Sequence, residues 1–123
     1  MSEKLIIAKE DRRDCLVVKL DGEFIFDEVA KFENFVKANR GKNHNIAIDM
    51  KKLVFLDSSG MGSLVKLLNF TRQISGGFYL YNVPEEVRKI FEVADLISFF
   101  NIVTESEFKA KFKTSLDDIM RRF

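Results

Sequence analysis

The chain has 123 residues, of which 46% are hydrophobic and 32% are charged. Its 20 basic and 19 acidic side chains leave a net charge of +1, so no overall field favours nucleic acid or a membrane surface. The length suits one domain, covering residues 1–123, with a core of its own. A nearly neutral surface of this kind points to a protein partner or a small ligand.

Two features of the sequence predict a cytoplasmic location. Residues 1–4 do not resemble a signal peptide, and no apolar run approaches the roughly 20 residues that cross a membrane. Cys15 is the only cysteine, so the chain can form no internal disulfide, which fits a reducing compartment. Because Cys15 lies in an apolar run, we expect a buried strand thiol rather than a reactive one.

The N-terminal part predicts a β-hairpin and then a helix. Residues 5–9 and 15–20 have the pattern of two strands, with a charged turn between them. Asp27 is a candidate N-cap for a helix that runs to about Asn39, and Gly41 stands where a helix end is expected. The apolar side of this helix consists of Val29, Phe32, Phe35 and Val36.

Strands and helices alternate through the rest of the chain. The predicted strands cover 46–50, 78–83 and a short segment at 102–103, and the predicted helices run from Ser59 to about Ile74, from Pro84 to about Ala94, and from a Thr104–Glu107 capping box to 123. One face of the last helix is formed by Phe108, Phe112, Leu116, Ile119, Met120 and Phe123. The resulting order, ββαβαβαβα, predicts an α/β fold with a central mixed β-sheet of about five strands and four helices.

The junction between the third strand and its helix carries an unusual run of small and polar residues. Asp57, Ser58 and Ser59 are three consecutive candidate N-cap residues, and Gly60 and Gly62 leave the first turn open to approach. A helix start has unpaired N–H groups and a partial positive charge, so it suits an anion such as phosphate. The same residues are typical of a plain helix cap, and the pattern alone favours that interpretation over an anion site.

The sequence offers no complete set of catalytic or metal-binding residues. A serine hydrolase would need His44, the only histidine, to reach Ser58 from the opposite end of the third strand, and a Gly-x-Ser-x-Gly elbow is absent. Gly60 and Gly62 lack the third glycine of a dinucleotide loop, because Val65 stands there, and no nucleotide P-loop is present. Metal-ligand spacings are also missing. We therefore predict a binding module that is not an enzyme and uses no cofactor or metal.

The residues around the junction resemble the signature of the STAS domain of bacterial anti-sigma factor antagonists. The resemblance is carried by 46–50, Leu53 and 55–62, and it extends to 20–23, 76–77, 83–84, Val87, Ile90 and Phe91. It covers about residues 4–110, so the last helix, extended to 123, runs past the usual end of the domain. It implies a STAS-type α/β domain in which the serine directly after the aspartate, Ser58 here, is the phosphoacceptor.

The resemblance also implies a function by partner switching. In that family, the unphosphorylated antagonist binds an anti-sigma factor that is also a GHKL-type serine kinase. Phosphorylation of the serine ends the interaction, and a PP2C-type phosphatase restores it. The surface expected to contact the partner comprises Asp57, Ser59, Gly60, Met61, Gly62, Glu23, Phe24 and Phe26. Phe99 and Phe100 also flank predicted turns, where an exposed ring could serve a partner.

Departures from the family pattern keep alternatives open. Family members often carry an acidic residue two positions after Glu23, whereas Ile25 stands there in this chain. Relatives with degenerate loops are subunits of lipid-transport ABC complexes, stressosome-like scaffolds or cytosolic domains of anion transporters. The retained run from Asp57 to Gly60 favours the phosphorylatable class. The stretch 114–123 is a candidate dimer contact or a cover for the sheet.

Overall fold

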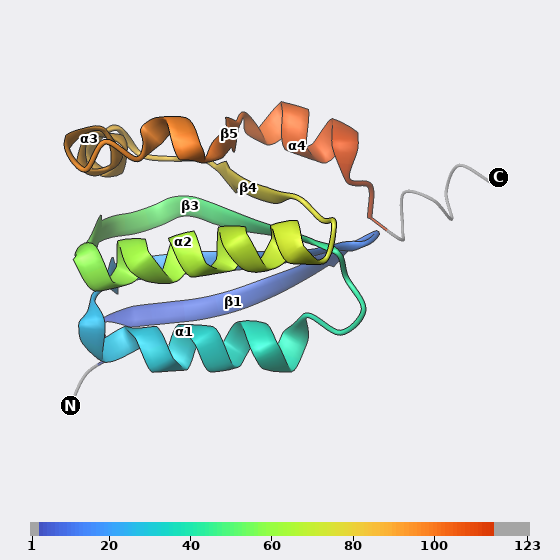
Figure 1. Cartoon of the computed structure of the whole chain (residues 1–123), viewed down its shortest axis with the longest axis horizontal. Coiled ribbons are helices and arrows are strands. Elements are labelled where there is room, and N and C mark those ends of the chain that lie inside the picture. The colour runs from blue at the N-terminus through green and yellow to red at the C-terminus, as the bar shows by residue number, and fades with distance from the viewer. Residues whose placement is uncertain (1–2, 115–123) are drawn as a thin grey trace, which may run out of the picture.

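A five-stranded sheet with helices on both faces forms the centre of the molecule (Figure 1). The computed structural model describes residues 3–114. The elements are β1 (Leu5–Arg12), β2 (Cys15–Phe24), α1 (Phe26–Asn39), β3 (Asn45–Leu56), α2 (Ser58–Gln73), β4 (Phe78–Tyr81), α3 (Glu85–Val93), the 3₁₀ helix η1 (Ile97–Phe99), β5 (Asn101–Val103) and α4 (Glu105–Lys111). The predicted order, the mixed five-stranded sheet and the four α-helices are confirmed for this part of the chain.

The sheet has the strand order β1-β2-β3-β4-β5, so strands that follow one another in the sequence also pair. β1 and β2 run antiparallel, as the predicted hairpin requires, and the remaining pairs are parallel. Parallel neighbours need a crossover, and α1, α2 and α3 supply the three that this sheet requires. The starts of these helices therefore lie along one edge of the sheet, at the carboxyl ends of the strands, where α/β proteins commonly bind ligands.

Alternating side chains of β2 divide the core between the two faces of the sheet. Leu16 and Val18 pack on one face with residues of α1, α2 and α3. Cys15 and Val17 pack on the other face with Phe108 of α4. Cys15 is fully buried, as predicted, and burial raises the pKa of its thiol to about 12. The larger core thus lies beneath the three crossover helices, and a smaller aromatic one lies beneath α4.

The helix α4 is shorter than the sequence pattern indicates. Its capping box is confirmed, because Thr104 Oγ1 accepts from the N–H of Glu107 at 3.1 Å and Glu107 Oε1 accepts from the N–H of Thr104 at 2.9 Å. The helix ends at Lys111, and Phe112 is extended, buried, and held by a hydrogen bond from Arg12 to its carbonyl oxygen. A continuous helix through Phe112 is therefore wrong. The rest of the predicted stripe, from 116 to 123, lies outside the described residues.

The strand β3 covers 12 residues and continues well past the predicted end at Met50. The sequence pattern suggests that Lys51 and Lys52, which are exposed, form a loop between the strand and the Asp57 junction. Lys52 instead pairs with Asp21 of β2. Two shifts in register between these strands break the simple alternation of buried and exposed residues, so no period of two marks the extension. The extension carries the chain straight to Asp57 at the edge of the sheet.

Three predicted helix starts move by one or two residues. α1 has Ile25, not Asp27, at its N-cap, and α2 begins at Ser58 rather than Ser59. Pro84 is the N-cap of α3 rather than its first residue. The sequence pattern did not predict η1.

Candidate functional site

The junction between β3 and α2 has Asp57 at the N-cap and Ser58 at the first helical position. Asp57 has an extended backbone, and its Oδ1 accepts a hydrogen bond of 2.9 Å from the N–H of Gly60. This bond satisfies one of the free N–H groups of the helix start. Of the three candidate caps, Asp57 is therefore the one that caps α2, which leaves both serine hydroxyls free of that role.

The same carboxylate also bonds to the start of α1. Asp57 Oδ2 accepts a hydrogen bond of 3.0 Å from the N–H of Phe26, the first residue of α1. The N-cap of α1, Ile25, has no side-chain oxygen and forms no cap bond. Asp57 therefore satisfies a free N–H in the first turn of α1, and one side chain ties two helix starts together.

Gly60 allows the start of α2 to approach the end of β2. A Cβ atom on Gly60 would lie 2.3 Å from the carbonyl oxygen of Phe24, far inside any tolerated contact. The N–H of Asp57 donates to the same carbonyl oxygen at 3.2 Å. Gly62 has no such role, because a Cβ there would meet nothing within 4 Å. The two glycines of the motif thus differ, the first being required by packing and the second lying on an open surface.

The two serines differ in accessibility. Ser58 is exposed, whereas Ser59 is half-buried. Neither hydroxyl forms a hydrogen bond with another described residue. The Ser58 side chain is therefore a free polar group that another protein can reach.

The aromatic residues expected on the partner surface separate into two groups. Phe26 and Phe99 are 72% and 56% exposed, as an exposed ring requires. Phe24 and Phe100 are core residues instead, and the expectation of exposed rings there is wrong. Phe24 is fully buried with its ring centroid 4.7 Å from that of Phe32, because β2 continues through position 24 and turns that side chain under α1.

The remaining expected contact residues lie around the junction at different depths. Glu23 is half-buried and pairs in register with Phe55 at the end of β3. Gly60 is buried, and Met61 is only 5% exposed. Gly60 therefore contributes by shaping the backbone, while Met61 reaches the surface only at the bottom of a groove.

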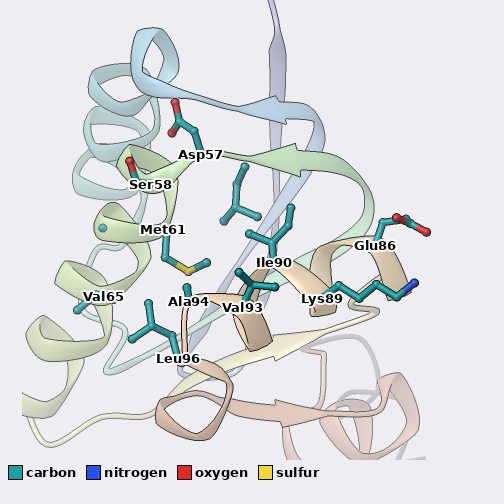
Figure 2. Close-up of a pocket in the computed structure, with 12 residues that line it drawn as sticks. Asp57, Ser58, Met61, Val65, Glu86, Lys89, Ile90, Val93, Ala94 and Leu96 are labelled. Carbon is teal, nitrogen blue, oxygen red and sulfur yellow. The ribbon is translucent and has the colours of Figure 1, made fainter.

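That groove lies between α2 and α3 and has a volume of about 680 Å³ (Figure 2). Asp57, Ser58 and Gly62 border it at the start of α2. The rest of its lining consists of Leu56, Met61, Val65, Glu86, Lys89, Ile90, Val93, Ala94 and Leu96. Most of these side chains are apolar, so an apolar concave surface lies next to the exposed serine.

Sequence reasoning missed the α3 side of this groove. The spacing of Val87, Ile90, Phe91 and Ala94 indicates one buried face, but only Val87 and Phe91 are buried. Ile90 is half-buried, and Val93 is 89% exposed. The available signal was Val93 itself, an apolar residue off the buried face.

His44 lies far from the serines. It precedes β3, whose 12 residues span on the order of 40 Å, whereas Ser58 follows that strand. The His44 ring is exposed and its Nδ1 lies 3.3 Å from Asp14 Oδ1. A hydrogen bond from the backbone N–H of His44 lowers the pKa of Asp14 below its ordinary value. The expectation that His44 is a surface loop residue, remote from Ser58, is confirmed.

Two kinds of feature are absent from residues 3–114. No helix there is both long enough and apolar enough to cross a membrane. No group of three or more His, Cys, Asp or Glu side chains there could hold a metal ion.

Comparison with known families gives a match to the model described as STAS domain, over residues 7–117. Two curated relatives carry the name of anti-sigma factor antagonist. BtrV of Bordetella bronchiseptica is 28% identical over 72 residues, covering 58% of this chain and 62% of BtrV. The match thus spans a little less than two thirds of that relative. The anti-sigma-B factor antagonist of Staphylococcus epidermidis is 23% identical over 90 residues, covering 72% of this chain and 83% of the relative.

Among solved structures, the anti-sigma factor antagonist SpoIIAA resembles this chain in both of its forms. Its unphosphorylated form is 25% identical and superposes with a TM-score of 0.73, covering 86% of this chain and 95% of SpoIIAA. Its phosphorylated form, described as a Bacillus cell fate determinant, is 24% identical with a TM-score of 0.67, covering 86% and 98%. The match of the phosphorylated form shows the shared fold.

Proposed function

The chain belongs to the STAS domain family, and on that premise we propose that it is an anti-sigma factor antagonist that acts by partner switching. Unphosphorylated, it binds an anti-sigma factor that is also a GHKL-type serine kinase. The kinase phosphorylates Ser58, which ends the interaction, and a PP2C-type phosphatase removes the phosphate. The protein acts in the cytoplasm as one domain, residues 1–123, without catalytic residues, cofactor or metal of its own.

The exposed hydroxyl of Ser58 is the observation that carries this proposal. A kinase must reach the group it modifies, and modification of Ser58 leaves the cap of α2 intact because Asp57 supplies it. A phosphoryl group on the first helical residue lies at the positive end of the helix dipole, so the fold tolerates it. Relatives named anti-sigma factor antagonists support the general function.

Phosphorylation changes the surface far more than it changes the fold. It adds a charge of about −1.5 to −2 and three strong acceptor oxygens. These would lie next to the Asp57 carboxylate and the apolar groove. A partner surface fitted to a neutral hydroxyl would lose about 3 kcal/mol or more, which corresponds to a roughly 100-fold weaker interaction.

Purified proteins test this proposal. A GHKL-type anti-sigma factor kinase from the same genome, supplied with ATP, is expected to add a single phosphate to the wild-type chain and none to Ser58→Ala, read by intact mass. In titration calorimetry with that kinase, Ser58→Ala binds as the wild type does, and Ser58→Asp binds roughly 100-fold more weakly. Ser106→Ala is the control, because Ser106 is an exposed serine in the first turn of α4 and lies outside the expected partner surface. This variant is expected to be phosphorylated on Ser58 and to bind normally.

Equal binding of the wild type and Ser58→Asp would contradict the switch. That result would favour the alternative, a constitutive subunit of a lipid-transport ABC complex or of a stressosome-like scaffold. Such a subunit would purify together with a larger complex and would carry no phosphate on Ser58.

A further inference from the structure

The groove between α2 and α3 borders Ser58, and we propose that it receives an amphipathic helix of the anti-sigma factor, with Val93 as the main contact (Figure 2). This assignment rests on the proposed function and deepens it. It names the side of Ser58 on which the partner lies and the chemistry of the segment that fits there.

The groove offers apolar contact from both of its helices. Figure 2 shows Met61 and Val65 on α2 and Ile90 on α3 along its walls. Val93 is 89% exposed, the highest value among the large hydrophobic side chains of the described residues. A valine in water contributes nothing to the isolated domain, whereas covering it removes apolar surface from water. Covering the groove is therefore favourable for any partner with a matching apolar side.

The size of the groove suits a helix. Its volume of about 680 Å³ lies between two helices and is open to solvent rather than enclosed. Amphipathic helices bind in such grooves through apolar side chains spaced three and four residues apart. A partner helix lying there would cover Val93 while keeping its polar side in water.

Charged residues on the rim of the groove indicate which charges the polar side of that partner helix would carry. Glu86 and Lys89 lie on the same side of α3, three residues apart, and both are exposed. Neither forms an ion pair with another described residue, whereas their neighbour Arg88 pairs with Glu92. A partner helix that carries an acidic residue opposite Lys89 and a basic one opposite Glu86 complements this rim.

The position of Ser58 explains how its phosphorylation would act on this groove. Ser58 and Asp57 form the end of the groove at the start of α2 (Figure 2). A dianion on Ser58 would place charge at the end of an apolar contact, where a partner would have to strip water from it. The switch therefore needs no rearrangement of the domain.

A second apolar region near Asp57 is the competing surface. Phe26 at the start of α1, and Val54 and Phe55 near the end of β3, are exposed, but they line none of the cavities described in this structure. A concave surface buries more of a partner side chain than a convex one does. The groove is thus the better docking site, and Val54 provides a matched control for Val93.

The test uses the full chain and the purified GHKL-type kinase in titration calorimetry. Val93→Asp is expected to weaken binding at least tenfold, because it puts a charge at the centre of an apolar contact. Ala94→Arg, which fills the groove from a second exposed position, is expected to do the same. Val54→Asp changes an exposed valine outside the groove and is expected to alter Kd less than threefold. Circular dichroism and intact mass confirm that each variant is folded and complete.

The outcomes separate this assignment from the proposed function. If Val93→Asp and Ala94→Arg bind normally while Ser58→Asp does not, the switch stands and the groove is not the docking site. If Val54→Asp alone weakens binding, the partner lies on the other side of Asp57. If Val93→Asp only turns a dimer into a monomer in sedimentation experiments, the occupant is a second copy of this chain. Each of these results overturns the assignment.

Discussion

The starts of α1 and α2 lie side by side at the same edge of the sheet but are stabilised in different ways. α2 has its own N-cap, Asp57, directly before its first residue. α1 has Ile25 in that position and receives its side-chain bond from Asp57, 31 residues away from Phe26 in the sequence. A cap can therefore be local or supplied by a neighbouring crossover. In the second case the two helix starts respond together to any change at the shared residue.

The largest expected effect comes from Gly60, which lets the start of α2 approach the end of β2. Gly60→Ala would put a Cβ 2.3 Å from the carbonyl oxygen of Phe24, so we expect a loss of about 3 kcal/mol or more in the free energy of unfolding. Gly62→Ala meets nothing within 4 Å and is expected to stabilise by about 0.5–1 kcal/mol, since alanine favours helix. Urea denaturation measures both. A neutral Gly60→Ala would mean that the helix start can move away from β2.

Removing the shared carboxylate is expected to have the next largest effect. Asp57→Ala removes both bonds and should cost about 2–3 kcal/mol in urea denaturation. Asp57→Asn should cost only about 1 kcal/mol, because its one oxygen can still cap α2 while its NH₂ cannot accept from Phe26. In the Asn variant, amide hydrogen exchange should speed up at Phe26 more than at Gly60. An equal increase in exchange at Phe26 and Gly60 would contradict the conclusion that each carboxylate oxygen of Asp57 bonds to a different helix.

Giving α1 a cap of its own should reduce its dependence on Asp57. Ile25 has the extended backbone of an N-cap, so Ile25→Ser is expected to stabilise the wild type by about 0.5–1 kcal/mol. In the Asp57→Asn background the same change should stabilise the chain by more than it does in the wild type, because the start of α1 then has no other side-chain acceptor. A double-mutant cycle from urea denaturation measures this coupling, and strict additivity would mean that the two caps act independently.

The smallest expected effect concerns Glu28, a buried carboxylate in the first turn of α1. It accepts from the N–H of Lys4 at 2.9 Å and pairs with Lys31 at 2.8 Å. The bond with Lys31, followed by that from Lys4, holds the pKa of Glu28 below its ordinary value. Because the folded pKa is the lower one, this stabilisation is present above roughly pH 5 and is lost as the pH falls through the folded value.

Glu28→Gln should therefore cost less than about 1 kcal/mol at pH 7, and its stability should fall less steeply below roughly pH 4.5 than that of the wild type. Denaturation at a series of pH values measures the difference. Parallel curves would show that Glu28 does not contribute to acid sensitivity.

The fold could be predicted because its signals are local. The capping box of Thr104 and Glu107 and the apolar spacing of α2 fix those elements from a few neighbouring residues. The extension of β3 through Lys52 could not be found in this way, because pairing with β2 across a register shift holds it in place. Ile25 as an N-cap could not be predicted for a similar reason. The hydrogen bond to the first N–H of α1 comes from Asp57, the N-cap of α2.

The candidate site was predictable at its centre and not at its border. The run from Asp57 to Gly60 marks the junction in any reading of the sequence, and Ser58 is exposed there. The α3 side of the groove depends on how far α3 lies from α2, which no local pattern records. Val93 and Phe24 have similar apolar character, yet one is 89% exposed and the other is fully buried.

The burial of Cys15 makes this chain convenient for site-specific labelling. Its thiol is protonated at neutral pH and closed off from solvent, so maleimide dyes should leave it untouched while the chain is folded. A cysteine introduced at Val54, an exposed position four residues before Ser58 that does not line the groove, would then be the one reactive thiol. A fluorophore attached there would report in real time on docking and release beside Ser58.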